Sequence, residues 1–152
     1  MREAAVSGAS ISVNLLEDQR LARRIDRLAA LDILPLLEGI GAEVVSQTQR
    51  RIAVDKASPS GQAWPEWSAE YAETRHSGQS LLQGENHLVN SMTFQTMGDS
   101  VLVGSPLVYA ATHQYGDEDR GIPQREYLGL EGVDLDDVVG LIEDYLEELA
   151  DE

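Results

Sequence analysis

The chain has 152 residues, a length that fits one domain. Its 27 acidic and 11 basic side chains give a formal net charge of −16. This charge argues against generic binding to nucleic-acid phosphates, since that needs Lys and Arg. It has no cysteine, which excludes disulfides and thiolate metal sites. No stretch approaches the roughly 20 apolar residues of a membrane span, and no basic segment followed by an apolar one opens the chain; we expect a soluble single domain over residues 1–152, made in a cytoplasm.

Two elements are expected before residue 31. Residues 7–13 place Ile11 and Val13 two apart, which predicts a short strand. Asn14 then fits the cap of an amphipathic helix, and three apolar residues follow on one face: Leu21, Ile25 and Leu28. The outer face of this helix is rich in arginine: Arg20, Arg23, Arg24 and Arg27. That face is either a solvated surface with local ion pairs or a docking face for an acidic partner.

A second, longer helix is expected from Asp32 to about residue 54. Asp32 can cap it, and Pro35 lies in the first turn, where its missing N–H does no harm. Small and apolar residues then recur at steps of three and four: Leu34, Leu37, Gly41, Val44, Thr48 and Ile52. Gly39 and Gly41 each cost the helix roughly 1 kcal/mol relative to alanine, so we expect another element to pack closely there. Two basic residues near its end are explained by the helix dipole: Arg50 and Arg51.

Residues 55–67 are expected to be a loop, because they contain two prolines and a glycine, and residues 75–86 are expected to be a second loop, because they are polar and contain glycine. The first loop contains both tryptophans of the chain, Trp64 and Trp67. Each carries a large apolar surface that either the chain itself or a partner must cover. Between the loops, Ser68 is predicted to cap a short helix that runs through Thr74.

The central part of the chain predicts a hairpin. Residues 81–91 turn the chain, and Asn86 suits a left-handed backbone position. Residues 91–104 alternate in hydrophobicity around a Gly-Asp turn signal, so we expect two antiparallel strands. A short helix over residues 106–116 and an exposed polar turn over residues 117–121 follow. An apolar segment then predicts one more strand: Tyr127, Leu128 and Leu130.

The chain ends in a predicted amphipathic helix. Asp134 fits its cap, with Asp137 at the third position, and one face is apolar: Leu135, Val138, Val139, Ile142, Tyr145, Leu146 and Leu149. Acids near its end, including a tail at residues 150–152, oppose the helix dipole. Residues 131–152 contain ten acids and no Lys or Arg, whereas eight of the 11 basic residues precede residue 60. This polarity suits basic and acidic faces that meet in an oligomer, and it suits solubility alone equally well.

Together these elements predict an α+β fold. We expect a small, mostly antiparallel sheet made of the N-terminal strand, the central hairpin and the late strand. Two N-terminal helices and the C-terminal amphipathic helix are expected to pack with it.

The side chains that carry chemistry indicate no reaction. His113 lies near three acids, but the spacing matches no helical His-Glu metal motif, and acids in a polar turn are usually solvated. The chain has no Gly-x-Ser-x-Gly elbow, and Gly39-Ile40-Gly41 lacks the rest of a phosphate loop. We expect no catalytic residue, no cofactor and no metal, with a His/carboxylate metal hydrolase as the last alternative.

Arg125 needs a structural explanation. Pro123 restrains the backbone two residues before it, and Tyr127 follows two residues later in the expected strand. A partly buried guanidinium there needs a carboxylate or several carbonyl groups for its five donors. Arg125 is therefore either a structural clamp or half of an ion pair between subunits.

An ordered series of motifs spans nearly the whole chain. Its members are Leu34-Pro35-Leu36-Leu37 with Ile40-Gly41, Pro59-Ser60-Gly61-Gln62-Ala63-Trp64, Leu81-Leu82 with Leu88-x-x-Ser91, Val103-Gly104, Tyr109-Ala110 with His113-Gln114-x-Gly116, and Ile122-Pro123-Gln124-Arg125-Glu126-Tyr127-Leu128-Gly129-Leu130. In this order they resemble the phage virion morphogenesis, or tail-completion, proteins of Mu-like and related tailed phages. The last two motifs in sequence carry most of the resemblance.

Several positions depart from the family pattern. Asn86 stands where the family has glycine, Gln124 where it has alanine, and Tyr127 where it has phenylalanine. Residues 67–81 also lack the Thr and Lys pattern of the family. These departures concern local contacts.

The resemblance implies a small α+β subunit that acts at the head–tail junction or at the end of the tail tube, without catalysis. Its implied partners are copies of itself, in a ring closed by head-to-tail contacts, and neighbouring tail-tube or head-connector proteins. No membrane and no specific nucleic acid is implied, and our hypothesis is that an acidic ring surface lets DNA pass without sticking. The implied location is the virion, after assembly in the host bacterial cytoplasm. The alternative is an assembly adaptor or chaperone that leaves before maturation.

Candidate structural or interface residues come mainly from the motifs: Trp64, Trp67, Tyr109, His113, Gln114, Pro123, Arg125, Tyr127 and Leu128. The arginine-rich face before residue 31 is a further candidate docking surface.

Overall fold

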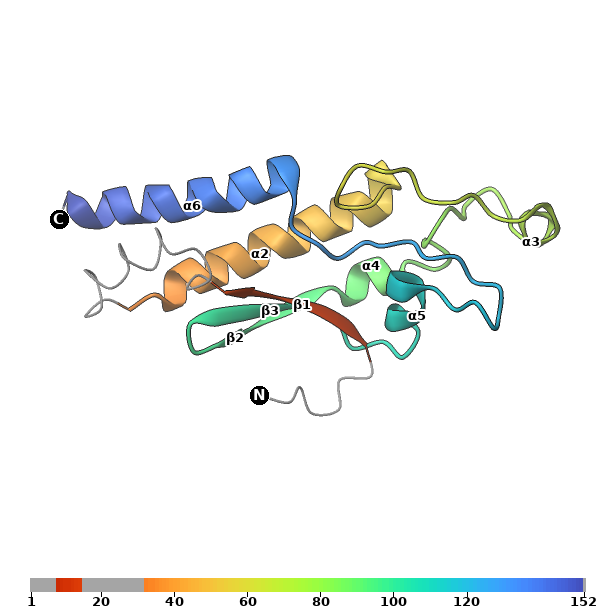
Figure 1. Cartoon of the computed structure of the whole chain (residues 1–152), viewed down its shortest axis with the longest axis horizontal. Helices are drawn as coiled ribbons and strands as arrows, with labels where there is room; N and C mark the ends of the chain where they lie inside the picture. The colour runs from red at the N-terminus through yellow and green to blue at the C-terminus, as the bar shows by residue number, and fades with distance from the viewer. Residues whose placement is uncertain (1–7, 15–31, 152) are drawn as a thin grey trace.

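The computed structural model describes residues 8–14 and 32–151 (Figure 1). Its elements, in chain order, are β1 (Ala9–Asn14), α2 (Leu34–Arg50), the π-helical turn η2 (Arg51–Asp55), α3 (Ala69–Glu73), α4 (His87–Ser91), β2 (Thr93–Met97), β3 (Ser100–Ser105), α5 (Ala110–Tyr115) and α6 (Gly132–Ala150). This arrangement confirms the predicted α+β class. The helix expected after Asn14, with Arg20, Arg23, Arg24 and Arg27, lies outside the described residues.

The sheet has three antiparallel strands in the order β1-β3-β2. The predicted hairpin forms β2 and β3, and β1 pairs with β3 from Ala9 opposite Ser105 to Asn14 opposite Ser100. Val101 and Val103 of β3 are fully buried and face α2, because successive residues of a strand point to opposite faces.

The long helix α2 packs across this sheet. Its first turn and its close contact with β2 at Gly41 agree with the sequence-based predictions. The Asp32 carboxylate accepts a hydrogen bond from the Leu34 N–H at 3.0 Å, and Pro35 lies in the first turn. A Cβ added to Gly41 would lie 2.4 Å from the Phe94 ring, whereas one added to Gly39 would meet nothing within 4 Å. The predicted close packing is therefore correct for Gly41 and wrong for Gly39.

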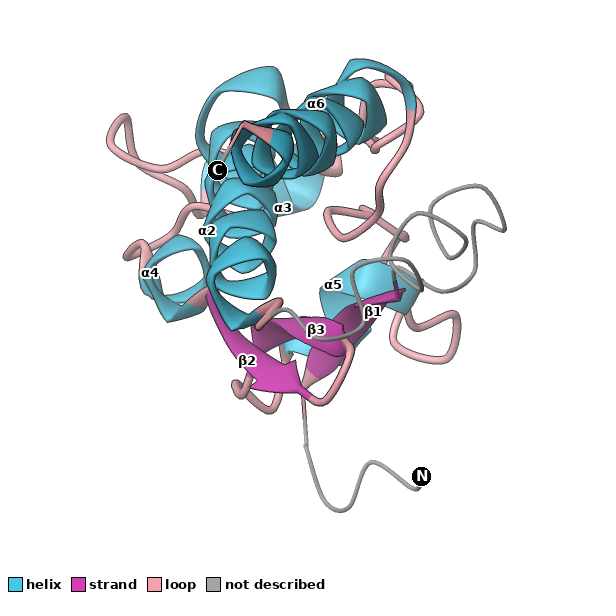
Figure 2. Cartoon of the chain, turned by 90° about the vertical axis from the view of Figure 1, so that its left-hand side faces the viewer, coloured by secondary structure: helices cyan, strands magenta, loops and turns pink. Residues whose placement is uncertain are grey.

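Helix α6 runs antiparallel to α2, which lies between it and the sheet (Figure 2). Val138 and Ile142 of α6 are buried with Leu37, Ile40 and Val44 of α2. Near the start of α2, the Tyr145 hydroxyl of α6 donates to the Asp32 carbonyl at 2.8 Å. No helix within the described ranges is long and apolar enough to cross a membrane.

The three short helices agree only partly with the sequence. Ser68 caps α3 through a hydrogen bond from the Tyr71 N–H at 3.2 Å, and Asn86 has the expected positive φ of 64°. It precedes α4, where only a turn was predicted. The helix predicted over residues 106–116 is the shorter α5, in which Gln114 is buried and Tyr115 is 65% exposed.

Two further expectations are corrected. Residues 123–130 form no strand, because side chains from other elements bind their backbone groups in place of a neighbouring strand. Asp134 does not cap α6, which begins at Gly132 after Glu131 without a side-chain cap. The Asp134 carboxylate lies in the first turn of α6 and binds two arginines of the α2–η2 helix instead.

Candidate functional site

Residues 123–130, called the core segment below, cross the molecule between the two cores and are held by side chains from distant elements. Gln114 of α5 makes three of these contacts. Its Oε1 accepts from the N–H groups of Tyr127 and Leu128, both at 3.0 Å, and its Nε2 donates to the Leu128 carbonyl at 3.1 Å. One amide side chain thus replaces part of a strand ladder, since an amide offers both donors and acceptors.

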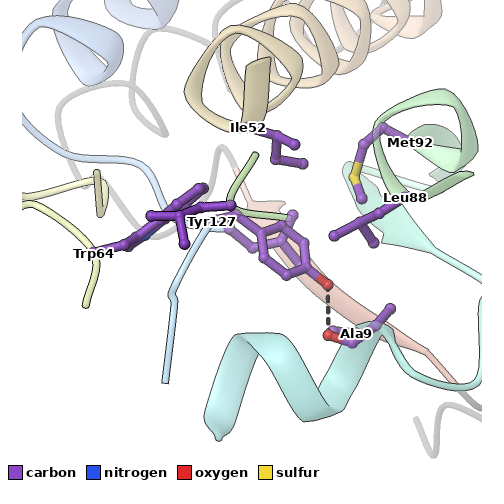
Figure 3. Close-up of a cluster of buried hydrophobic side chains, with 9 residues drawn as sticks. Ala9, Ile52, Trp64, Leu88, Met92 and Tyr127 are labelled. Atoms are coloured by element: carbon purple, nitrogen blue, oxygen red, sulfur yellow. Dashed lines mark hydrogen bonds between the residues drawn. The ribbon is translucent and has the colours of Figure 1, made fainter. Parts of the chain in front are cut away.

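Tyr127 anchors the core segment in a hydrophobic cluster. Its ring is fully buried beside Ile52, Trp64 and Leu88 (Figure 3). The hydroxyl donates to the Ala110 carbonyl at 2.7 Å, and burial raises the pKa of the phenol well above its usual value. Tyr127 is therefore a neutral, hydrogen-bonded core residue, and it ties the core segment to α5. Leu128 is almost fully buried in the same cluster.

The loop at residues 55–67, called the tryptophan loop below, packs on the core segment. The Trp64 ring is buried, and its Nε1 donates to the Glu126 carbonyl at 2.8 Å. A Cβ on Gly129 would lie 2.5 Å from the Pro59 ring, so only glycine permits this approach. Trp67 is half-buried against the same cluster. Of the two alternatives for the tryptophans, coverage by the chain itself is confirmed for Trp64.

Arg125 binds backbone carbonyls of the same loop. Its Nε donates to the Pro65 carbonyl at 2.8 Å, and its Nη2 donates to the Glu66 carbonyl at 3.2 Å. The Arg125 N–H donates to the His113 carbonyl at 2.9 Å. Only 7% of this residue is exposed, and burial lowers the pKa of its guanidinium. These contacts are those of a clamp between α5, the core segment and the tryptophan loop.

A partly buried cluster of charges joins the α2–η2 helix to α6, and the sequence interpretation missed it. Arg50 and Arg51 bind the two oxygens of the Asp134 carboxylate at 2.7 Å and 2.6 Å, and Arg51 also donates to the Tyr127 carbonyl. Burial raises the pKa of Asp134, but hydrogen bonds from both arginines outweigh it and lower the pKa overall. The available signal was periodicity: Asp134 precedes buried Val138 and Ile142 by four and eight residues, on the same helix face.

The only lysine of the chain, Lys56, ends the π-helical turn and was also missed. Its Nζ lies within hydrogen-bond distance of the Ile52 carbonyl at 2.5 Å, the Leu81 carbonyl and the Gln83 Oε1 at 2.8 Å, and the Ser80 hydroxyl at 3.0 Å. Burial lowers its pKa to about 8, so the ammonium still predominates at neutral pH. No sequence signal marks this contact, because its partners are mostly carbonyl groups.

An open groove of about 980 Å³ lies beside the clamp, and it is the concave surface that the remaining candidates share. Its walls include Trp67, Tyr71, Tyr109, His113 and Pro123. The rings of Trp67 and Tyr71 meet edge to face at 6.0 Å, as do those of Tyr109 and His113. The groove thus offers aromatic surface that the subunit only partly covers.

His113 supports the groove from α5. Burial, together with the nearby charges of Arg125 and Arg120, lowers the pKa of its imidazole, so the ring is neutral at neutral pH. Its Nδ1 is buried and has no hydrogen-bond partner among the described residues. Within residues 8–14 and 32–151, no group of three or more His, Asp or Glu side chains is placed to hold a metal ion.

The structure therefore divides the predicted candidates into two groups. Trp64, Gln114, Arg125, Tyr127 and Leu128 meet in one network around the core segment. Trp67, Tyr109, His113 and Pro123 line the groove next to it. The motif pair at residues 109–116 and 122–130 is a pair in space as well, since each half binds the backbone of the other.

Comparisons with known proteins agree on one family. The sequence model of the phage virion morphogenesis family matches residues 16–147. A candidate capsid assembly protein, G, of Escherichia phage Mu is 27% identical over 136 residues, which covers 80% of this chain and 86% of the Mu protein. No solved structure is significantly similar.

Proposed function

The chain belongs to the phage virion morphogenesis family, and from this premise we propose that it is a structural protein that completes the tail or joins the tail to the head, as an oligomeric ring. Membership of this family indicates a role in phage virion assembly. The observation that carries the proposal is the extent of the match, which reaches from residue 16 to residue 147 and includes every motif that predicted the resemblance.

The geometry of the motif residues supports a structural role. Gln114, Arg125 and Tyr127 use their polar atoms on backbone carbonyls and amides of the same subunit. These contacts hold α5, the core segment and the tryptophan loop in one fixed arrangement. A side chain already engaged in this way shapes a surface for neighbours, and on this basis we propose that the protein is not an enzyme.

The proposed partners are other copies of this chain and the neighbouring tail-tube or head-connector proteins. The proposed location is the virion neck or the end of the tail. DNA passes through the proposed ring, whose acidic character suits passage without adhesion. A ring with a basic lumen would contradict that part of the proposal, and a cryo-EM map of the neck would show it.

A second candidate function is favoured by the name of the Mu relative, which describes capsid assembly and not presence in the particle. In that case the chain is an adaptor or chaperone that leaves before maturation. Mass spectrometry of purified virions distinguishes the two: a stoichiometric amount of this chain supports the structural protein, and its absence supports the adaptor.

The principal test is deletion of the gene from the phage, with complementation from a plasmid as control. We expect filled heads and tails that stay separate, or tails with defective ends, visible by negative-stain electron microscopy. Normal infectious virions from the deletion phage would contradict a role in assembly, and a lasting monomer in solution would contradict the ring.

A further inference from the structure

The groove and the end of α6 lie at opposite ends of the long axis of the subunit (Figure 1). The last turns of α6 carry five exposed acids: Glu143, Asp144, Glu147, Glu148 and Asp151. No ion pair joins any of them to a basic side chain within the described parts of the chain. Acids near a helix C-terminus are unfavourable, because they add to the negative end of the helix dipole. Cationic side chains placed beside these acids would stabilise this helix end.

The basic side chains of the described region leave one place for such a contact. Arg50, Arg51 and Lys56 are bound within the subunit. The other three described basic residues line the groove: Arg75, Arg120 and Arg125. Arg125 binds carbonyls, as described above, and Arg120 is paired with Asp117 at 2.6 Å. Arg75 stacks on the Tyr71 ring, 4.6 Å from its centroid, and has no carboxylate partner in the described ranges.

The groove is also less repulsive to an acidic helix than the net charge of the chain would suggest. Three glutamates balance its three arginines: Glu66, Glu70 and Glu85. Its formal charge is therefore zero, against −16 for the whole chain. Its aromatic walls suit the partly exposed Leu149, which lies beside the acids of α6. Helices commonly bind in grooves through such a combination of apolar anchors and charge complementarity.

We propose that the groove binds the C-terminal end of α6 of a second copy of this chain, with Arg75 facing its carboxylates. The two surfaces cannot meet within one subunit, because they lie at its opposite ends (Figure 1). The contact is heterologous, and such contacts close into a ring when the rotation between copies permits it. The inference rests on the proposed self-assembly and specifies which two surfaces carry it.

Cross-linking tests the contact directly, because the chain has no cysteine of its own. Thr74→Cys places a thiol on the groove and Glu148→Cys places one on the end of α6. When the two variants are mixed and treated with a short bifunctional maleimide, we expect a covalent dimer that joins position 74 to position 148. The matched control is Glu38→Cys on the exposed side of α2, mixed with Glu148→Cys, which should give no such dimer.

Charge reversal gives a second, independent measurement. We expect Arg75→Glu to weaken association about tenfold in analytical ultracentrifugation, and Glu147→Lys with Glu148→Lys to do the same. Combining the reversals in one chain should restore association, whereas Glu38→Lys should leave it unchanged.

The outcomes separate this inference from the proposed function. Oligomers that form without the 74–148 cross-link, or that join position 148 to position 148, would overturn the groove contact and leave the ring standing. A chain that stays monomeric at all concentrations would overturn both.

Discussion

Gln114 shows how much one side chain supports in this fold. Its amide satisfies two N–H groups and one carbonyl of the core segment. Leucine has nearly the same volume but no polar atom, so Gln114→Leu would leave three buried backbone groups unsatisfied. We expect a loss of about 3–5 kcal/mol in the free energy of unfolding, measured by urea denaturation.

Gln124→Leu is the matched control, because the Gln124 side chain is exposed and donates only to the Gln114 carbonyl. It should cost less than about 1 kcal/mol. Equal losses for both variants would show that the Gln114 contacts contribute nothing special.

The ion pairs of Asp134 with Arg50 and Arg51 make the contact between α6 and the α2–η2 helix dependent on pH. Its pKa in the folded state is lowered by two arginines, so the stabilisation is present above the ordinary Asp pKa and is lost as pH falls below about 4. Asp134→Asn leaves the buried Arg51 without its anion, so we expect a loss of about 3 kcal/mol at neutral pH. The variant should also show a flatter decline in melting temperature between pH 4 and pH 2.

Asp144→Asn, on the exposed side of α6, is the control and should leave that profile unchanged. A wild-type profile that shows no decline below pH 4 would argue against the coupling.

Substitutions of Arg125 distinguish a structural clamp within the subunit from an ion pair between subunits. Alanine removes the donors to the Pro65 and Glu66 carbonyls, so we expect about 2–3 kcal/mol of destabilisation by thermal unfolding and impaired assembly. Lysine keeps the charge but lacks the fork that binds both carbonyls, so Arg125→Lys should be nearly as damaging. Rescue by lysine would favour an ion pair instead, and a soluble, fully assembling Arg125→Ala protein would show that the clamp is unimportant.

At the scale of elements, the two glycines of α2 form a matched pair. Gly41 touches the Phe94 ring, so the added methyl of Gly41→Ala has to displace it, and we expect a loss of about 1–3 kcal/mol. Gly39 faces open space in the same helix, and Gly39→Ala should gain about 0.5–1 kcal/mol through helix propensity. Urea denaturation of both variants checks the signs, and similar effects would contradict the packing of β2 on α2.

Elements with a local signal were predictable from the sequence, and those stabilised from a distance were not. Alternation and the Gly-Asp turn identified the hairpin, and Ser68 and Asn86 took the backbone roles that their side chains favour. The late strand was predicted wrongly because Tyr127 and Leu128 are as apolar as strand residues. Their backbone partners are Gln114 and Arg51, and no local pattern predicts a side chain as a substitute for a strand.

The candidate site followed the same division. The motifs identified Gln114, Arg125 and Tyr127, which the structure brings together. Arg51 and Asp134 were missed because the helix dipole and a capping position offered sufficient local explanations. Arg51 and Asp134 bind each other although they lie 83 residues apart in the chain. Only the periodic placement of Asp134 on the buried face of the last helix indicated this contact.

At the scale of the whole molecule, α2 lies on the three-stranded sheet, α6 lies on the far side of α2, and a loop-rich end carries the groove (Figures 1 and 2). The helix pair and the sheet form one core, and the short helices and loops surround the other. The core segment and Arg51 connect them. The molecule therefore presents two chemically different ends, a feature that the proposed head-to-tail self-assembly would use.

The side-chain attachment of the core segment also has a kinetic consequence. Its hydrogen bonds to Arg51 and to the tryptophan loop join residues 59 to 76 positions apart, and contacts of such long range are expected late in folding, after the hairpin and α2 have closed the shorter loops. Arg125→Ala should therefore accelerate unfolding and leave the folding rate nearly unchanged, giving a φ-value near zero in stopped-flow chevron measurements. The network would then be the last part of the fold to form, and its loss would set the rate at which the subunit unfolds.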